Sequence, residues 1–291
     1  MEEFLAASDR FSTDEGVAKG LAYRPDPTDI FISPYAKCGT TWMQQIVHGL
    51  RSGGDMDFTE ITEVVPWLEL AHDLKLDLDA PQLARPHAFK SHLGWEEIPK
   101  GGRYIVVFRD PLDAMVSLYN FMDGWFFEPG MITLDAFADY VLSRPDEDGY
   151  WGHATGWWGQ RDNPDVLLLA YEHMKADLPG AVARVADFMG GYDAERIALA
   201  TRQAGFDFMK AHAGQFDDNL VRRMRDAACG LPDGAVSNKV NEGRSGVGKA
   251  SLSPDIRAAL DARWQATMGA RHGLVSYAAL LEELEVSRSG P

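Results

Sequence analysis

The sequence has little cysteine and no long apolar run. Only two of its 291 residues are cysteine, Cys38 and Cys229, which gives neither a disulfide framework nor the ligand spacing of a zinc site. No apolar stretch approaches the roughly 18 residues that a membrane-spanning helix needs. The acidic N-terminus also lacks the basic start and apolar core of a signal peptide. These absences favour a soluble protein in a reducing compartment, and we expect it to be cytoplasmic.

Positive charge is also scarce. The chain has 28 Lys and Arg residues against 44 Asp and Glu residues, a formal net charge of −16. This balance argues against nucleic acid and against anionic membranes as partners. An anionic ligand would therefore need a local basic pocket. The composition, 45% apolar and 25% charged, is that of an ordinary globular protein with enough apolar residues for a sizeable core.

A chain of 291 residues can form one large α/β domain or two small ones. We find no internal repeat, no low-complexity segment and no linker that would divide it, so we expect one domain over residues 1–291. Residues 1–28, which include Pro25 and Pro27, predict an irregular approach to the first strand. From about Ser287 onwards we expect a frayed tail.

One strand, loop and helix dominate the pattern. The apolar run at residues 30–32 indicates a buried strand, and a helical pattern follows it after a short loop. The loop contains Lys37, Gly39, Thr40 and Thr41. Backbone N–H groups at a helix N-terminus, a glycine that admits close approach and a lysine together favour a phosphate-binding site. The alternative is an ordinary strand-to-helix turn with a threonine N-cap.

The loop does not match two well-known phosphate-binding patterns. In the Walker pattern the lysine follows a glycine, whereas here Lys37 precedes Gly39 and no glycine opens the loop. A cysteine phosphatase loop beginning at Cys38 would need arginine at position 44, which is Gln44. The loop therefore predicts phosphate binding without ordinary nucleotide hydrolysis or cysteine phosphatase chemistry.

A second strand with a charged end is predicted at residues 104–108. This continuous apolar run is typical of a strand that is covered on both faces of a parallel sheet. Arg109 follows it directly, and Pro111 marks a helix start. Ligands bind at the carboxyl ends of such strands, and a guanidinium suits a phosphate. The alternative is a salt bridge from Arg109 to Asp110 or Asp113.

The rest of the chain continues this alternation of strands and helices. Residues 166–170 predict a third buried strand, and helices are expected over residues 134–142, 179–189 and 255–268. We therefore expect an α/β fold with a central, mostly parallel sheet flanked by helices and a P-loop-like strand–loop–helix unit.

Lys90 and His92 are candidate catalytic residues. Residues 85–99 predict a short strand followed by a loop, and alternation in a strand places the Lys90 and His92 side chains on the same face. An imidazole is the usual general base for a hydroxyl, although a lone histidine is more often structural. His87 has no comparable neighbour, and we expect it on the surface.

Aromatic residues are concentrated in a few segments, where they could be core or could form the wall of an apolar ligand cavity. Trp67 stands beside Pro66, and both interpretations stay open for it. As candidate contacts to an acceptor molecule we select Trp67, Phe121, Trp151 and His153. A second glycine-rich, basic loop contains Gly243, Arg244 and Ser245, and it could instead be a flexible linker.

Three segments together resemble the cytosolic sulfotransferase family. Residues 35–42 are similar to that family's Pro-Lys-Ser-Gly-Thr-Thr-Trp loop, Arg109 and Ser117 to its 3′-phosphate motif, and residues 90–93 to its Lys-x-His-Leu segment. The motifs occur in the family's order over roughly residues 28–270, with weaker matches at residues 66–69, 157–158 and 171–175.

The resemblance implies a single α/β domain that transfers a sulfuryl group from 3′-phosphoadenosine 5′-phosphosulfate (PAPS) to a hydroxyl or amine, leaving adenosine 3′,5′-bisphosphate (PAP). It assigns His92 as the base, Lys37 to the leaving phosphate and Lys90 to the sulfuryl oxygens. The donor site would consist of the loop residues Cys38, Gly39, Thr40 and Thr41, the 3′-phosphate ligands Arg109 and Ser117, and Trp42, Tyr171 and Phe206 near adenine. No metal is required.

Two alternatives remain: an ATP-dependent small-molecule kinase on a P-loop-like fold, and a catalytically impaired PAP binder. The chain departs from the family pattern at Cys38, where serine is usual, and we predict a lowered thiol pKa and oxidative sensitivity there. The Arg-Lys pair of the late 3′-phosphate motif is replaced by Asn241 and Glu242. We expect Arg244, Lys239 or the backbone at Ser245 to substitute. The family's dimerisation motif is not recognisable, so monomer and homodimer are both open.

Overall fold

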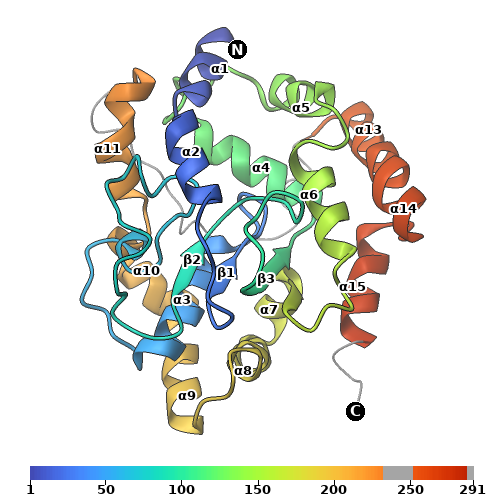
Figure 1. Ribbon diagram of the computed structural model, residues 1–291. Coiled ribbons are helices and arrows are strands. Elements are labelled where there is room, and N and C mark those ends of the chain that lie inside the picture. The colour runs from blue at the N-terminus through green and yellow to red at the C-terminus, as the bar shows by residue number, and fades with distance from the viewer. Residues whose placement is uncertain (232–251, 287–291) are drawn as a thin grey trace.

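Four parallel strands form the central sheet of the protein (Figure 1). In a computed structural model of the chain, which describes residues 1–231 and 252–286, the strand order is β2-β1-β3-β4. The strands are β1 (Ile30–Ile32), β2 (Ala88–Lys90), β3 (Arg103–Phe108) and β4 (Val166–Ala170). The predicted α/β fold with a parallel sheet is confirmed.

Alternate residues of the strands pack into two separate cores, as the period of two in a strand requires. Along β3, Tyr104, Val106 and Phe108 belong to one apolar cluster, whereas Ile105 and Val107 belong to the other. Both faces of the sheet are therefore covered, which explains why its strands appear in the sequence as continuous apolar runs.

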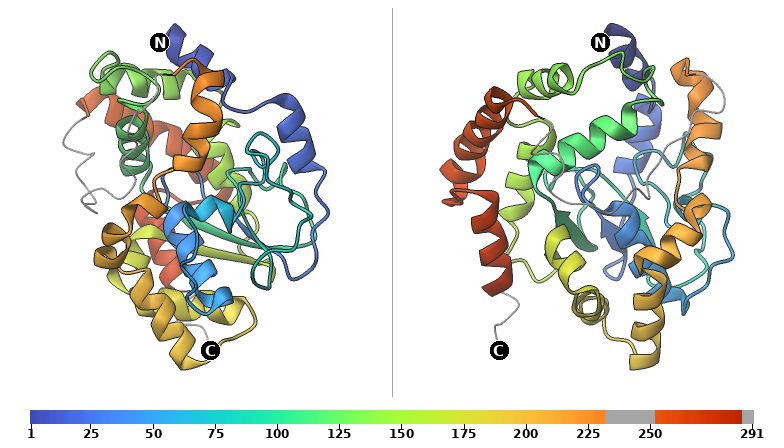
Figure 2. Two further views of the ribbon diagram at one scale, coloured as in Figure 1. Left: turned by 90° about the vertical axis from the view of Figure 1, so that its left-hand side faces the viewer. Right: turned by 180° about the vertical axis from the view of Figure 1, so that it is seen from behind.

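Helices lie on both faces of the sheet (Figures 1 and 2). On one face α3 (Thr40–Ser52) packs against α8 (Leu178–Phe188) and α9 (Ala194–Gln203). The other face is covered by α4 (Pro111–Met122), α5 (Leu134–Ser143), α6 (Gly149–Trp158) and α13 (Pro254–Trp264). The remaining described elements are η1 (Ile61–Glu63), α7 (Tyr171–Ala176), α10 (Phe206–Ala211), η2 (Ala213–Gln215), α11 (Asn219–Cys229), η3 (Gln265–Gly269), α14 (Ala270–His272) and α15 (Tyr277–Val286).

The sequence predicted an irregular N-terminal segment, and this prediction is wrong. The segment forms two helices, α1 (Glu2–Asp9) and α2 (Asp14–Leu21). Phe4 of α1 is buried and packs edge-on against Phe127 at 5.6 Å between ring centroids. The Thr13 side chain caps α2 by accepting the Gly16 N–H. Helix α1 also packs against α11 (Figure 2). Tertiary burial of one aromatic ring outweighs the weak local helix signal.

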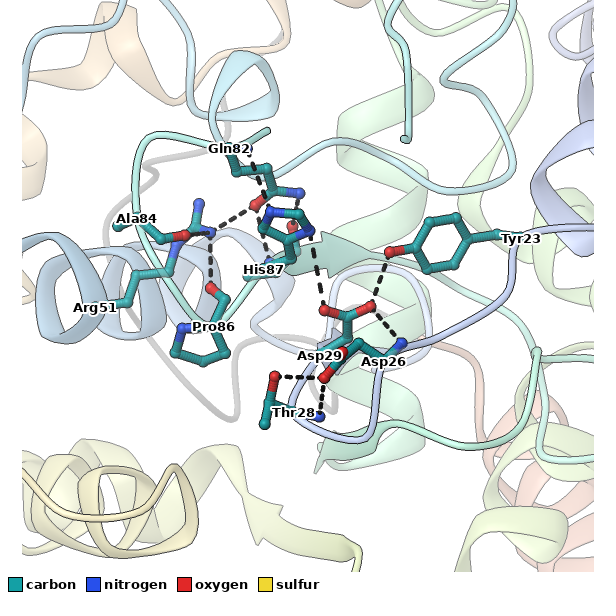
Figure 3. Close-up of polar contacts among 10 residues, drawn as sticks. Tyr23, Asp26, Thr28, Asp29, Arg51, Gln82, Ala84, Pro86 and His87 are labelled. Carbon is teal, nitrogen blue, oxygen red and sulfur yellow. Dashed lines mark hydrogen bonds and ion pairs between the residues drawn. The ribbon is translucent and has the colours of Figure 1, made fainter. Parts of the chain in front are cut away.

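A network of polar side chains lies at the amino ends of β1 and β2 (Figure 3). Asp29, which is fully buried, accepts hydrogen bonds from the Tyr23 hydroxyl at 2.8 Å and the Asp26 N–H at 2.9 Å. Nδ1 of His87 lies 3.9 Å from Oδ1 of Asp29. His87 was expected on the surface but is 8% exposed, because the residues before β2 fold over it.

Arg51, near the end of α3, extends the same network to the chain before β2 (Figure 3). Its guanidinium donates to the side chain of Gln82 at 2.5 Å and to the carbonyls of Ala84 and Pro86 at 3.2 and 3.0 Å. Gln82 in turn accepts the Ala88 N–H of β2. The amino end of the sheet is thus fastened by contacts within the chain.

Within the residues that the structure describes, no helix is long and apolar enough to cross a membrane.

Candidate active site

The loops after the carboxyl ends of β1, β2 and β3 open on one cavity of about 840 Å³. This is the edge at which open α/β sheets bind ligands. The predicted site residues that line the cavity are Lys37, Gly39, Thr40, Thr41, Trp42, Trp67, Lys90, His92, Arg109, Ser117, Phe121, Tyr171 and Phe206.

Other predicted contacts do not reach the cavity. Trp151 is 2% exposed and lies beneath the Arg263 guanidinium, which is 5.3 Å from its ring centroid. The ring of His153 donates from Nε2 to the Ser33 carbonyl at 3.0 Å, and burial lowers its pKa to about 4. The acceptor role predicted for Trp151 and His153 is therefore not supported, because α6 turns both side chains into the core.

The predicted late loop, with Gly243, Arg244 and Ser245, lies outside the described residues. So do Lys239, Asn241 and Glu242, and the tail from Ser287.

The loop between β1 and α3 has the local geometry of an anion site. Lys37 and Gly39 both adopt left-handed backbone conformations, with φ of +64° and +97°. A Cβ on Gly39 would lie 3.1 Å from the Tyr171 ring, so glycine is needed for space as well as for conformation. Helix α3 then begins at Thr40, whose buried hydroxyl has no hydrogen-bond partner among the described residues. A buried hydroxyl at a helix N-terminus is suited to an anion.

Arg109 fastens this loop to the end of β3. Its guanidinium donates to the Lys37 carbonyl at 2.8 Å and lies 4.6 Å from the Tyr171 ring centroid. The buried Nε of Arg109 has no hydrogen-bond partner within the described chain. Asp110, one of the two salt-bridge partners in the alternative interpretation, caps α4 by accepting the Leu112 N–H. Arg109 thus presents a cation to the cavity beside the loop.

The thiol of Cys38 differs from the sequence prediction. Its side chain is fully buried under the loop. Burial raises the pKa of the Cys38 thiol to about 12, outweighing the Arg109 charge, which lowers it. The predicted low pKa at Cys38 is therefore wrong, because a thiolate enclosed by apolar side chains loses more solvation than the nearby cation restores. Cys38 contributes its backbone to the loop rather than a reactive sulfur.

Two hydrogen bonds orient His92. Nδ1 lies 2.8 Å from the Pro34 carbonyl, and the backbone N–H donates to Oε1 of Glu69 at 2.7 Å. A carbonyl can only accept, so Nδ1 carries a proton, and Nε2 is the basic nitrogen of the corresponding neutral tautomer. The ring orientation of His92 is thereby fixed at the cavity. Burial raises the pKa of the Glu69 carboxyl, and the bond from His92 opposes that rise.

Lys90 ends β2 and is 3% exposed. Its Nζ lies 3.5 Å above the Trp67 ring centroid. Nζ of Lys37, which also lines the cavity, lies 3.9 Å above the Phe121 ring centroid. Both ammonium groups are therefore next to aromatic rings that line the same cavity.

Aromatic rings form the cavity wall beyond these lysines. Phe11 contacts Trp67 and Phe126 at 5.7 and 5.6 Å between centroids, and Phe121 contacts Trp125 at 5.0 Å. Such a wall suits an apolar, ring-bearing molecule. Sequence reasoning did not anticipate that Ser8 and Phe11 reach the cavity. Their role depends on how α1 and α2 fold back, for which the local sequence gives no signal.

Comparisons with known proteins agree with this geometry. The sequence model of the sulfotransferase domain family matches residues 27–271. Sulfotransferase 1C2 of Rattus norvegicus is 28% identical over 65% of this chain and 68% of its own. The amine sulfotransferase of Oryctolagus cuniculus is 28% identical over 72% of this chain and 73% of its own.

Solved structures have the same fold. Mouse sulfotransferase SULT7A1, crystallised with PAP, aligns with a TM-score of 0.68 at 19% identity, over 96% of this chain and 95% of its own. Retinol dehydratase with retinol and PAP aligns with a TM-score of 0.67 at 20% identity, over 87% of each chain. Since the family model covers most of the chain, including the four strands that the structure describes, this protein belongs to the sulfotransferase family and is a sulfotransferase.

Proposed function

We propose that the protein transfers a sulfuryl group from PAPS to a hydroxyl or amine of an apolar small molecule. The observation that carries this proposal is that a phosphate-type loop, a strand-end arginine and an oriented histidine share one cavity with an aromatic wall. The PAP bound in two solved structures of the same fold supports PAPS as the donor. Location in the cytoplasm and the choice between monomer and homodimer remain predictions.

The donor would lie between two groups of residues. Thr40, Thr41 and the loop N–H groups would hold the 5′-phosphate, and Arg109 and Ser117 the 3′-phosphate. Thr40 Oγ1 and Arg109 Nε, which find no hydrogen-bond partner in residues 1–231 and 252–286, fit this assignment, because buried polar groups without partners are costly unless a ligand satisfies them.

Adenine would lie against Trp42 and Phe206. The Trp42 indole is held by its N–H bond to the Ala204 carbonyl at 2.8 Å and by the Tyr171 ring at 5.4 Å. Phe206, by contrast, is 45% exposed, as a ring is when its stacking partner is a ligand.

PAPS supplies the sulfuryl group, and three side chains of this protein assist its transfer. Nε2 of His92 would take the proton of the acceptor hydroxyl, which the bond from Nδ1 to the Pro34 carbonyl makes possible. Lys37 would stabilise negative charge on the leaving phosphate, and Lys90 charge on the sulfuryl oxygens. The surrounding rings exclude water and strengthen these interactions.

Titration calorimetry distinguishes this proposal from a kinase. We expect PAP to bind at least about tenfold more tightly than ATP, with no change on adding EDTA, because Arg109 and Ser117 serve a 3′-phosphate that ATP lacks. A preference for ATP or a need for Mg²⁺ would favour the kinase. PAP binding without sulfation of any hydroxyl or amine in a panel of apolar acceptors would favour the impaired binder.

A further inference from the structure

Trp67 contacts both residues of the proposed catalytic pair. Nζ of Lys90 lies 3.5 Å above its ring centroid, and the His92 ring meets it edge-on at 5.1 Å between centroids. The indole also lines the cavity. Trp67 is therefore placed between the acceptor space and the two side chains that would act on the acceptor.

Backbone pairing fixes this arrangement. The Lys90 N–H donates to the Pro66 carbonyl and the Leu68 N–H donates to the Lys90 carbonyl, both at 2.8 Å. Trp67 and Lys90 thus face each other across a short parallel bridge. Residues directly opposite each other on paired strands project to the same face, so the bridge places the indole and the Lys90 side chain next to each other.

The contact with the Trp67 ring also offsets part of the cost of burying the Lys90 ammonium. Its side chain is 3% exposed, and a buried ammonium is costly unless other groups compensate for the lost water. The negative face of an indole ring is the strongest aromatic partner for a cation, and the attraction increases when water is excluded. A lysine has four flexible side-chain bonds, and a ring that covers the ammonium restricts their rotation.

We propose that Trp67 is a positioning residue that holds the Lys90 ammonium where the transferred group develops charge. The inference rests on the proposed function, since Lys90 has a catalytic role only in that reaction. If Trp67 were merely a part of the acceptor wall, its loss would weaken acceptor binding. As a positioning residue, it acts on the rate of transfer with acceptor bound, and it does so through Lys90.

The test compares Trp67→Leu, which removes the aromatic face, with Trp67→Phe, which keeps one. With radiolabelled PAPS and saturating 2-naphthol as the probe acceptor, we expect Trp67→Leu to lower kcat about tenfold and Trp67→Phe by no more than about threefold. A change confined to the KM for 2-naphthol, or equal losses of kcat in both variants, would overturn the inference.

A double-mutant cycle shows whether Lys90 carries the effect. In a Lys90→Met background, measured by single turnover with excess enzyme, we expect Trp67→Leu to cost less than about twofold. The same tenfold loss in both backgrounds would overturn the inference. Trp95→Leu is the matched control, because Trp95 also carries a lysine, Lys100 at 4.6 Å, but does not line the cavity. A comparable loss of kcat in Trp95→Leu would show a general effect of tryptophan removal.

A measurement without turnover separates this inference from the proposed function. In the NMR spectrum of the nucleotide-free protein, we expect the ε-methylene protons of Lys90, assigned with Lys90→Met, to be shifted upfield by the indole and to lose that shift in Trp67→Leu. Their absence from the upfield region in the unmodified protein would contradict the inference. Failure of the unmodified protein to sulfate both 2-naphthol and 2-naphthylamine would instead count against the proposed function.

Discussion

The amino and carboxyl ends of the sheet both contain buried polar and charged groups, but those at the carboxyl end line a cavity and those at the amino end do not. At the amino end, Asp29 accepts from Tyr23 and Asp26, and Arg51 donates to three groups in the chain before β2 (Figure 3). At each end, some buried atoms find no hydrogen-bond partner within the described chain: Asp29 Oδ1 and Arg51 Nε at the amino end, Thr40 Oγ1 and Arg109 Nε at the carboxyl end. The difference is that Thr40 and Arg109 line the cavity of about 840 Å³, whereas Asp29 and Arg51 do not.

This comparison shows how a structural polar network differs from a ligand site in one fold. Hydrogen bonds within the chain stabilise the amino end of the sheet. Removing one polar side chain there leaves its buried partner without a hydrogen bond. The carboxyl end gathers Lys37, Lys90 and Arg109 around one cavity in a chain whose net charge is −16. Like charges gathered against the overall field of the protein indicate an anionic ligand.

The largest effect is expected at His92. Replacing His92 by Ala should lower kcat about a thousandfold, the usual contribution of a general base, while PAP affinity stays within about twofold of the unmodified protein. Radiolabelled transfer and calorimetry measure the two quantities. Retained turnover in His92→Ala would contradict its role as the base and would remove the main functional feature of the carboxyl end.

A second prediction concerns Arg109. Replacing Arg109 by Met should weaken PAP binding about a hundredfold, since charge-assisted hydrogen bonds to a phosphate are lost. Calorimetry with PAP gives the affinity, and adenosine 5′-monophosphate, which lacks the 3′-phosphate, provides the control. We expect Arg109→Met to affect the control ligand far less. An equal loss for both ligands would show that Arg109 acts only by shaping the loop at Lys37.

The smallest effect on nucleotide binding is expected at the amino end. Replacing Asp29 by Ala should lower the free energy of unfolding by about 2 kcal/mol, because the Tyr23 hydroxyl and the Asp26 N–H lose their acceptor. PAP affinity should stay within about twofold. Urea unfolding and calorimetry measure the two effects, with Asp29→Asn as the milder variant. If Asp29→Ala weakened PAP binding as much as Arg109→Met does, the amino end would not have a purely structural role.

The sequence predicted those parts of the fold and site that have local signals. The run at residues 104–108, Pro111 after it and the glycine and threonines of the first loop each dictate backbone structure directly. The predictions from sequence were wrong where packing between segments that are distant in the chain determines the structure. The placement of Trp151 and His153 depends on which way α6 faces, and the Cys38 pKa on how deeply the loop is covered. The helices α1 and α2 likewise depend on Phe4 finding an aromatic cluster far along the chain.

The burial of Cys38 makes its thiol a probe of the opening of the loop between β1 and α3. A thiol with no exposed surface and a pKa of about 12 reacts with an alkylating reagent only during moments when the loop opens. The labelling rate of Cys38 therefore reports the opening equilibrium of the loop between β1 and α3, provided that Cys229, also buried, is first replaced by serine. An anion bound in the loop should lower the alkylation rate of Cys38. The rate therefore gives the fraction of protein with an occupied anion site, and no acceptor has to be known.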